Sequence, residues 1–505
     1  MKREMKRIAM AAVAATAVIA GMAQSVKADE IDWGAILEER REMSADYAIK
    51  LYTENSSGAQ PYYGAKFEPI KGVYLGMVAE SSTEFAPMGS YLTYMEDMWQ
   101  EDLYYPANQM IKEDNVLTEI GWTINDISTV DYSVIRARLE TLNAYGKPML
   151  IRFASEFNCN ALGNDAAAYV AMFRTVADMV HEYPNLGIVW SPVDIGGLDK
   201  SFADFYPGDE YVDWVGASCY SQRYFCGKQD TSDIESDYFF TGANSWATNK
   251  LKPLMNFLAE YNIRKPVMLS ECGVATNNKY GEDCTAFAVP RLRNMLYSVI
   301  MEYPQIKLIN YFNSYRENEI ECYDISAYPY AAQIFNEAAN SGAFIRELGG
   351  ESDFVFTAWE SSGEIEVSDN LLSVYATAGS ASDESLEFRL DGEWYHRADG
   401  APYRCMLVLD ELADGVHTLE VYNAHERVER CFLKSGNSVY FAGEGEELVY
   451  ETEEEITEEI TEEETACEEE ISEDECSMAA IHRHMGIKDM NRAQYKAWQL
   501  SGVCR

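Results

Sequence analysis

The sequence predicts an α/β fold, namely a (β/α)8 TIM barrel followed by a small all-β sandwich domain and an acidic disordered C-terminal segment. Two changes of pattern along the chain lead to this prediction. Between residues 71 and 345, short apolar runs alternate with longer amphipathic helical patterns. Between residues 350 and 443, the runs become short and alternating and are broken by Gly, Asp and Asn. A length of 505 residues with 47% hydrophobic residues accommodates two cores.

Residues 1–28 have the pattern of an export signal. Four basic residues near the start precede the apolar stretch 8–23, and Val26-Lys27-Ala28 is a small-x-small cleavage site. The apolar stretch is short and rich in alanine, which disfavours a membrane span. We therefore expect a secreted, extracellular protein, and an association with the cell surface or cell wall stays open.

Residues 29–70 are predicted to be an N-terminal lead-in. A helical pattern covers residues 35–52, and polar turn residues follow in 53–64.

The predicted barrel occupies residues 71–345. Eight strands with intervening helices in about 275 residues are typical of a (β/α)8 barrel. An open doubly wound sheet is the alternative, but no GxGxxG motif opens a helix here. The eight predicted strands are 72–78, 90–96, 115–124, 148–157, 186–193, 213–220, 266–274 and 306–314.

The region from 350 to 443 is predicted to be an Ig-like or carbohydrate-binding β-sandwich. Cys405 and Cys431 fall in its strands and are candidates for a disulfide, and we expect Trp359 and Trp394 to pack in its core. Residues 444–476 form an acidic low-complexity linker, disordered by composition. Residues 477–505 form a short basic tail to which we assign no function.

Charge and cysteine usage exclude several classes of function. The formal net charge is −44, which disfavours nucleic acid and anionic membranes as partners, although 18 acidic residues are concentrated between 444 and 475. The 11 cysteines permit disulfides in an exported chain, but none has zinc-ligand spacing. We expect no metal and no cofactor.

Two related stretches each end an apolar strand with Ser-Glu. KPMLIRFASEFN covers residues 147–158 and ends near Glu156, and KPVMLSECG covers residues 265–273 and ends near Glu271. These are the fourth and seventh predicted strands, which lie roughly opposite each other across the barrel mouth. Catalytic residues gather at the carboxyl ends of barrel strands, so we expect the two carboxylates to converge.

Converging carboxylates suit the cleavage of a glycosidic bond. At a separation of ~5–5.5 Å, one attacks the anomeric carbon while the other protonates the leaving oxygen, which gives retention of configuration. Repulsion between like charges keeps one carboxyl protonated as the acid. Spacing does not say which glutamate has which role. A purely structural alternative is that a glutamate pairs with Arg152, which shares a strand face with Glu156.

Other catalytic chemistries lack their residues in this region. Between residues 30 and 345 the one histidine is His181, in a helical pattern away from the strand ends, where a catalytic triad would need it. GxSxG and phosphate-binding loop motifs are absent from the sequence. We therefore interpret the site as a carboxylate pair.

From about residue 72 to 314, the sequence resembles glycoside hydrolase family 26. IRFASEFN is similar to the family's Arg-Phe-x-x-Glu-x-Asn stretch, which implies that Glu156 is the acid/base. LSECG is similar to its Ser-Glu-aromatic stretch, which implies that Glu271 is the nucleophile. VWSPV and FYPGDEYVDWVGASCY also resemble family segments, so that Trp190 would shape the sugar cleft and Tyr220 would hydrogen-bond the nucleophile. We group Arg152, Asn158, Trp190 and Tyr220 as candidate substrate-binding residues.

The chain departs from the family pattern at three places. Ser155 stands where histidine is common, and Cys272 replaces an aromatic residue after the nucleophile. The stretch 159–169 lacks the family's tryptophan-rich loop, and Tyr224, Phe225 and Trp246 are the candidates to supply a stacking platform instead.

We expect a secreted monomer, and the resemblance implies a retaining endo-glycosidase that cleaves β-linked plant polysaccharide, with β-1,4-mannan as the first expectation. A β-xylanase or β-glucanase on the same scaffold is the alternative within this class. A catalytically inactive carbohydrate-binding surface protein is the alternative from another class.

Overall fold

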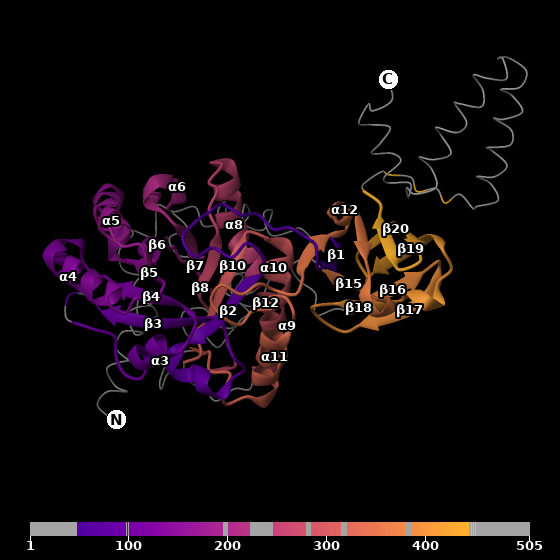
Figure 1. Cartoon of the computed structure of the whole chain (residues 1–505), viewed down its shortest axis with the longest axis horizontal. Helices are drawn as coiled ribbons and strands as arrows, with labels where there is room; N and C mark the ends of the chain where they lie inside the picture. The colour runs from indigo at the N-terminus through magenta and orange to yellow at the C-terminus, as the bar shows by residue number, and fades with distance from the viewer. Residues whose placement is uncertain are drawn as a thin grey trace, which may run out of the picture. The chain divides into compact units, whose positions relative to one another are not determined.

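A computed structural model describes residues 48–443 apart from 97, 99, 195–199, 223–245, 279–283, 315–320 and 379–384, together with residues 446, 448 and 450. Its largest sheet is a closed ring of eight parallel strands, because the last strand pairs with the first (Figure 1). This closure confirms the (β/α)8 barrel and rules out the open doubly wound sheet. The ring contains β2 (Val73–Val78), β3 (Ser90–Glu96), β4 (Leu117–Thr123), β5 (Met149–Phe153), β6 (Leu186–Trp190), β7 (Trp214–Ser221), β8 (Val267–Val274) and β10 (Ile306–Tyr311).

The barrel strands are buried on both faces, and alternation sorts their side chains. In β5, Met149, Ile151 and Phe153 belong to the core shared with the helices, whereas Leu150 belongs to a separate cluster inside the barrel. Arg152 therefore points inward, above Leu150, toward the carboxyl ends of the strands.

Helices cover the outside of the ring and begin at recognisable caps. The Asp131 side chain accepts the backbone N–H groups of Ser133 and Val134, and Asp165 accepts that of Ala168. The covering helices are α3 (Ala107–Glu113), α4 (Tyr132–Asn143), α5 (Ala166–His181), α6 (Phe202–Phe205), α8 (Ala247–Glu260), α9 (Thr285–Arg293), the π-helical turn η9 (Asn294–Ser298), α10 (Val299–Glu302) and α11 (Pro329–Asn340).

The lead-in segment closes the amino end of the barrel. Ala65 and Phe67 pack against the inner cluster that contains Leu150 and Trp214. The indole N–H of Trp214 donates to the carbonyl oxygen of Lys66 at 2.7 Å, and the Lys66 ammonium donates to the carbonyl oxygen of Leu186 at 2.6 Å. The interior is therefore filled from below, and polar groups collect at the opposite end.

The C-terminal region forms two antiparallel sheets around a second core, as predicted. One contains β13 (Val355–Ala358), β1 (Lys50–Asn55), β15 (Leu371–Thr377) and β18 (Arg404–Val408). The other contains β14 (Glu364–Glu366), β21 (Ser438–Phe441), β20 (Arg427–Ser435), β19 (Gly415–Tyr422), β16 (Leu386–Leu390) and β17 (Glu393–Ala398).

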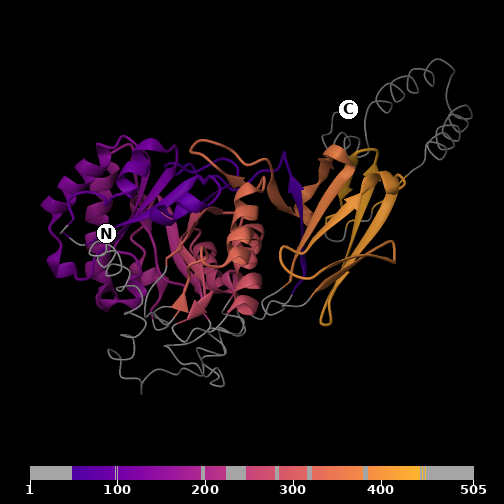
Figure 2. The same cartoon turned by 90° about the horizontal axis from the view of Figure 1, so that it is seen from below.

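Strand β1 comes from the lead-in, where the sequence pattern predicts the end of a helix. Figure 2 shows this indigo strand among the orange strands of the C-terminal sheets. It pairs with both β13 and β15 in antiparallel register, and Leu51 lies in the sandwich core. Backbone pairing on both edges and burial of one face outweigh the local helical pattern, so the sandwich combines residues from both sides of the barrel sequence.

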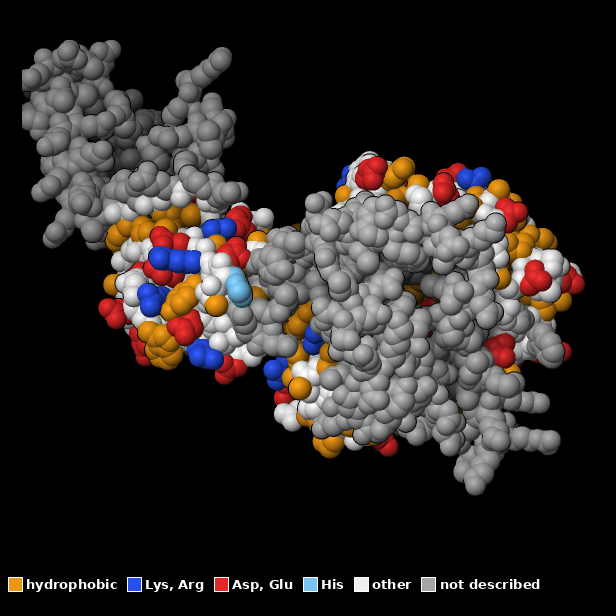
Figure 3. Space-filling view, turned by 180° about the vertical axis from the view of Figure 1, so that it is seen from behind, with side chains coloured by type: hydrophobic (Ala, Val, Ile, Leu, Met, Phe, Trp, Pro, Cys, Tyr) orange, Lys and Arg blue, Asp and Glu red, His pale blue; other side chains and the backbone are white. Residues whose placement is uncertain are grey.

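Two expectations for the sandwich side chains are wrong. Cys405 on β18 and Cys431 on β20 are both free thiols. Trp394 is 64% exposed on edge strand β17, whereas Trp359 is buried as expected. On the face visible in Figure 3, basic, acidic and hydrophobic side chains are interspersed over the sandwich, in line with exposed ion pairs such as Arg427–Glu429.

Several predicted segments lie outside the described residues: the export signal, the acidic segment beyond residue 450 and the C-terminal tail. Within the described part of the chain, every helix is too short or too polar to span a bilayer.

Candidate active site

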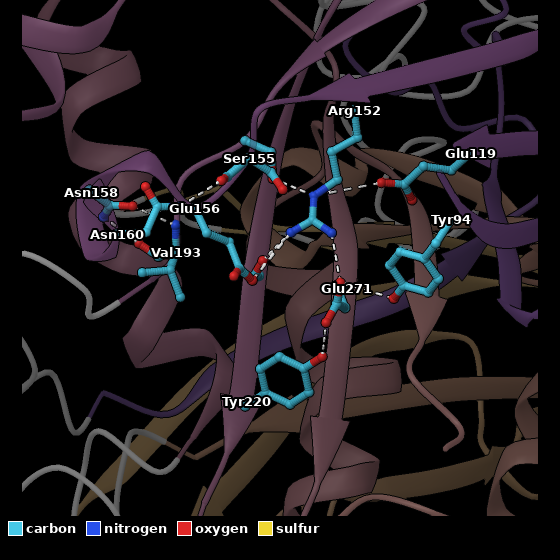
Figure 4. Close-up of polar contacts among 12 residues, drawn as sticks. Tyr94, Glu119, Arg152, Ser155, Glu156, Asn158, Asn160, Val193, Tyr220 and Glu271 are labelled. Atoms are coloured by element: carbon cyan, nitrogen blue, oxygen red, sulfur yellow. Dashed lines mark hydrogen bonds and ion pairs between the residues drawn. The ribbon is translucent and has the colours of Figure 1, made fainter. Parts of the chain in front are cut away.

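Arg152 on β5 connects the two predicted glutamates at the carboxyl end of the barrel (Figure 4). Its Nη1 donates to Oε2 of Glu271 at 2.7 Å, and its Nη2 lies 3.4 Å from Oε1 of Glu156. Nε donates to the hydroxyl of Ser191 at 3.1 Å, and Nη2 also donates to Ser218. Because the guanidinium is planar and held on three sides, it sets the relative position of both carboxylates.

A bulge in β8 turns Glu271 toward the barrel interior. Leu269 aligns with Ala217 of β7, but the next residue of β7, Ser218, aligns with Glu271. The register with β10 shifts over the same residues. The extra residue interrupts the alternation, so that Leu269 and Cys272 both face the helices while Glu271 points inward.

A glycine on the neighbouring strand makes room for this bulge. A Cβ on Gly216 of β7 would lie 2.2 Å from the hydroxyl oxygen of Ser270. A side chain at Gly216 would therefore displace Ser270 and, with it, the turn that presents Glu271.

The end of β5 is held in an unusual backbone conformation. Ala154 has φ of 50° and Glu156 has φ of 59°, both in the left-handed region that non-glycine residues rarely adopt. The backbone N–H of Glu156 donates to the carbonyl oxygen of Ser191 at 2.8 Å, which anchors this turn to β6. Such strain clusters at functional sites, where the surrounding structure over-determines the conformation.

Two tyrosines donate to Glu271. The hydroxyl of Tyr94 on β3 donates to Oε2 at 3.0 Å, and that of Tyr220 on β7 donates to Oε1 (Figure 4). The Tyr220 contact is the one that the family resemblance implies. Glu271 thus receives donors at both oxygens, and these stabilise its ionised form.

The electrostatic environment of Arg152 is strongly acidic. Burial disfavours its charge, but the charges of Glu271, Glu156 and Glu119 outweigh burial and raise the pKa of Arg152 above its usual value. The guanidinium is therefore a permanent cation at the centre of three carboxyl groups.

Contact with a common guanidinium limits the distance between the two glutamates. Since both carboxylates contact terminal nitrogens of the same planar group, their nearest oxygens lie within roughly 8 Å of each other. This distance is compatible with direct attack by one glutamate and protonation by the other. The structure thus brings together the two residues that the sequence separates by 115 positions.

A third carboxyl, that of Glu119, lies beneath the site and is absent from the sequence-based prediction. It is fully buried on β4, with Oε1 3.9 Å from Nε of Arg152 and Oε2 accepting from the amide of Asn310 at 2.7 Å. The available signal is a single acidic residue inside the apolar run NVLTEIGWTI. Tyr94 had a weaker signal, since aromatic residues are common in strands.

Three of the predicted substrate-binding residues, Trp190, Arg152 and Asn158, are buried and do not line the barrel mouth as expected. Trp190 is completely buried on the helix-facing side of β6, packed on Phe157 and Tyr206, and its indole N–H donates to Phe205 at 3.0 Å. Strand alternation turns it away from the mouth, so the predicted cleft role is wrong. Arg152 is 1% exposed and contacts the glutamates. Arg152 is therefore placed to contact the glutamates and is too buried to make the substrate contact that was predicted.

Asn158 clamps two loops together. Its amide nitrogen donates to the carbonyl oxygen of Val193 at 2.9 Å, and its amide oxygen accepts the N–H of Val193 at 2.8 Å. Asn158 is 3% exposed, which makes it a structural link between the ends of β5 and β6 in place of the expected sugar ligand.

The alternative stacking residues divide into two groups. Trp246 is buried and carries Arg291 over its ring at 4.4 Å, so it does not form an open platform. Tyr224 and Phe225 lie outside the described residues.

A closed (β/α)8 barrel with two carboxyl groups converging at its carboxyl end is the architecture of a carboxylate-dependent glycosidase. Residues 125–277 match the sequence profile of glycosyl hydrolase family 26. This segment contains both glutamates, and its similarity to family 26 glycosyl hydrolases indicates a glycosidase.

Solved structures give more distant similarities, and no curated protein matches the chain. A double mutant of the Cellulomonas fimi endo-β-1,4-mannanase has 12% identity and a TM-score of 0.41, over 72% of this chain and 95% of that one. The Bacteroides ovatus family 26 β-mannanase has 12% identity and a TM-score of 0.39, over 63% and 96% of the two chains. These values are too low to bear on activity.

Proposed function

We propose that this protein is a secreted, retaining endo-glycosidase that cleaves β-linked plant polysaccharide, with β-1,4-mannan as its substrate. The observation that carries the proposal is the bridge of Arg152 between Glu156 and Glu271. It supports a catalytic pair because two glutamates from different strand ends share one buried cation at the barrel mouth.

The contacts support different roles for the two glutamates. Glu271 accepts hydrogen bonds from Arg152, Tyr94 and Tyr220 and its side chain is 5% exposed, which suits an ionised nucleophile. Glu156 has a longer contact with Arg152 and a side chain that is 12% exposed, which suits a group that exchanges protons with substrate and water.

The proposed reaction has two displacement steps. A Glu271 oxygen attacks the anomeric carbon, the bond to the leaving oxygen breaks, and the proton of Glu156 passes to that oxygen. A water molecule then attacks the anomeric carbon of the glycosyl ester and gives its proton to Glu156, while the bond from that carbon to the Glu271 oxygen breaks and the carboxylate is restored. The configuration at the anomeric carbon is retained because it inverts twice.

The choice of β-mannan rests on the family resemblance of the sequence. Family 26 enzymes act mostly on β-1,4-mannans, and some act on xylans or mixed-linkage glucans. Residues 159–169 contain no tryptophan, in contrast to the family's tryptophan-rich loop, and the xylanase and β-glucanase alternatives are therefore included in the test.

Incubation of the purified mature chain with mannan, xylan and mixed-linkage glucan, followed by measurement of new reducing ends, tests the proposal. We expect cleavage of mannan, and proton NMR of the first products should show the β-anomer. Cleavage of xylan or glucan alone would change the substrate. Binding without any cleavage would favour the inactive carbohydrate-binding alternative.

A further inference from the structure

The carboxyl group beneath the catalytic pair has no role in the reaction proposed above. Glu119 is fully buried in the barrel interior, on the strand next to that of Arg152. Gly121 aligns with Arg152, and Glu119 aligns with Leu150, so Glu119 lies two residues closer to the amino end of the barrel. Its Oε1 has no hydrogen-bond partner among the described residues, and lies 3.9 Å from Nε of Arg152.

The neighbouring strands hold Glu119 firmly in this place. The Asn310 amide on β10 donates to Oε2 at 2.7 Å. A Cβ on Gly76 of β2 would lie 2.4 Å from the amide oxygen of Asn310, so this glycine provides the space for the Asn310 side chain. The position of the Glu119 carboxyl is thus fixed by contacts with the neighbouring strands.

Charge balance indicates the protonation state of Glu119. A retaining glycosidase at rest needs an ionised Glu271 and a protonated Glu156, and Arg152 alone neutralises that one negative charge. A second buried anion at Glu119 would have no counterion of its own among the described residues, which is costly in a dry interior. A neutral Glu119 leaves the net charge of the cluster at zero.

Hydrogen-bonding capacity leads to the same state. The amide oxygen of Asn310 also has no hydrogen-bond partner among the described residues. An ionised carboxylate offers only acceptors, whereas a protonated one offers an O–H donor. A proton on Glu119 therefore supplies a donor beside the unpartnered amide oxygen of Asn310.

The groups that face Glu119 explain why the proton is retained. Burial raises the pKa of Glu119 to about 8, and the Glu271 charge on β8 raises it further. The charge of Arg152 on β5 and hydrogen bonds from Asn310 on β10 and Ser270 on β8 lower it by less. The thiol of Cys272 on β8 is the other titratable group in electrostatic contact with Glu119, and burial raises its pKa well above the usual value, so it stays neutral.

We propose that Glu119 is a positioning residue that stays protonated beneath Arg152 throughout the reaction and leaves the guanidinium free to serve Glu271 and Glu156 in turn. Arg152 neutralises ionised Glu271 at rest. Once Glu271 is an ester and Glu156 has lost its proton, the same cation neutralises Glu156. An ionised Glu119 would draw the guanidinium toward its own Oε1 and away from both. This inference rests on the proposed function.

The kinetic test uses an aryl glycoside of the preferred oligosaccharide whose leaving group departs without protonation, so that titration of Glu156 does not limit the first step. We expect kcat/KM of the wild type to fall above about pH 8, in step with ionisation of Glu119. In Glu119→Gln this alkaline fall should disappear. Glu119→Leu should lose activity about tenfold, and Glu119→Gln should keep most of the activity that Glu119→Leu loses. Coincident wild-type and Glu119→Gln profiles would overturn the proposal.

Glu68→Gln is the matched control, since Glu68 is also a buried carboxyl. It accepts the backbone N–H groups of Tyr63 and Ala65 at the amino end of the barrel. Its pH profile should coincide with that of the wild type. A shifted alkaline limb in Glu68→Gln would attribute the effect to general loss of a buried carboxyl and contradict the specific role of Glu119.

An infrared measurement separates this inference from the proposed function, because it needs no activity. In Glu156→Gln, the carbonyl band of a protonated carboxyl should persist at pH 7, and it should be missing from the double variant Glu119→Gln/Glu156→Gln. Identical spectra would show that Glu119 is ionised and reject the inference even if the enzyme is active. If the protein cleaves no polysaccharide but shows the band, the proposed function is rejected and the protonation of Glu119 is retained.

Discussion

Nη1 of Arg152 lies 2.7 Å from Oε2 of Glu271, and both side chains are almost fully buried. A short charge-assisted contact in a dry site is stronger than one in water, and the loss of either partner leaves a buried charge. This pair therefore couples the position of the proposed nucleophile to that of Glu156, which contacts the other terminal nitrogen of Arg152.

Arg152→Lys should lower kcat by about 100-fold, because a single ammonium does not span two carboxylates as a planar guanidinium does. Steady-state kinetics on the preferred polysaccharide measure this effect. Arg136→Lys is the control, since Arg136 also makes a two-nitrogen contact with a carboxylate, that of Glu182, but at the exposed surface. Equal losses in both variants would argue against a special role for the buried bridge.

The two glutamates should differ when substrates of different reactivity are compared. Glu271→Gln should abolish turnover of every substrate, because the nucleophile is missing. Glu156→Gln should lose polysaccharide cleavage and still release the aryl group of an activated glycoside in an initial burst, because that leaving group needs no proton. Stopped-flow absorbance detects the burst, and a burst in Glu271→Gln instead would reverse the assigned roles.

Tyr220→Phe should reduce kcat by about 10- to 100-fold, because it removes a hydrogen bond to a charged group. The melting temperature should change little, since the ring remains in place. Tyr206→Phe is the control, because its hydroxyl donates to Asp209 at the surface at 2.8 Å. Wild-type kcat in Tyr220→Phe would contradict the proposed role of its hydroxyl.

Trp190→Ala should destabilise the protein by about 3–5 kcal/mol, because it leaves a cavity among Phe157, Tyr206 and Phe205. Urea unfolding measures this change. The KM of the fraction that remains folded should stay at the wild-type value, since the indole does not reach the mouth. A large increase in KM with unchanged stability would restore the cleft role that the sequence resemblance implies.

Stability should depend on pH through Glu119. Its pKa is raised by burial to about 8 in the folded protein, and it falls to the ordinary carboxyl range on unfolding. The contribution is thus fully present below the unfolded pKa and is lost as pH rises toward 8. Between pH 5 and pH 8, the free energy of unfolding of the wild type should fall relative to Glu119→Gln by on the order of 3 kcal/mol. Parallel urea titrations at both pH values measure this difference, and equal pH dependence in the two proteins would contradict it.

The barrel could be predicted from the sequence because its evidence is local. Each of the eight apolar runs coincides with a strand, from β2 (Val73–Val78) to β10 (Ile306–Tyr311). Parallel strands buried on both faces need continuous apolar runs, and Asp131 and Asp165 mark helix starts in the sequence itself. The sequence does not reveal strand β1, because its pairing partners lie 300 or more residues away.

Glu156 and Glu271 were accessible to prediction because each ends an apolar strand, where a carboxylate stands out. The inward turn of Glu271 was not, since it depends on a bulge that shifts the register against both neighbouring strands. The direction of the Trp190 side chain was likewise not accessible, since alternation along a strand does not say which of its two faces points into the barrel and which points to the helices.

The sequence alone determined the barrel, the sandwich and the presence of two acidic groups at strand ends, because hydrophobic periodicity and residue type are properties of short segments. Only the tertiary structure decided that Arg152 joins those groups, that Glu119 lies beneath them and that Trp190 points away. Such relationships depend on strand register and barrel closure, which come from contacts between residues distant in the chain and have no counterpart in any local pattern.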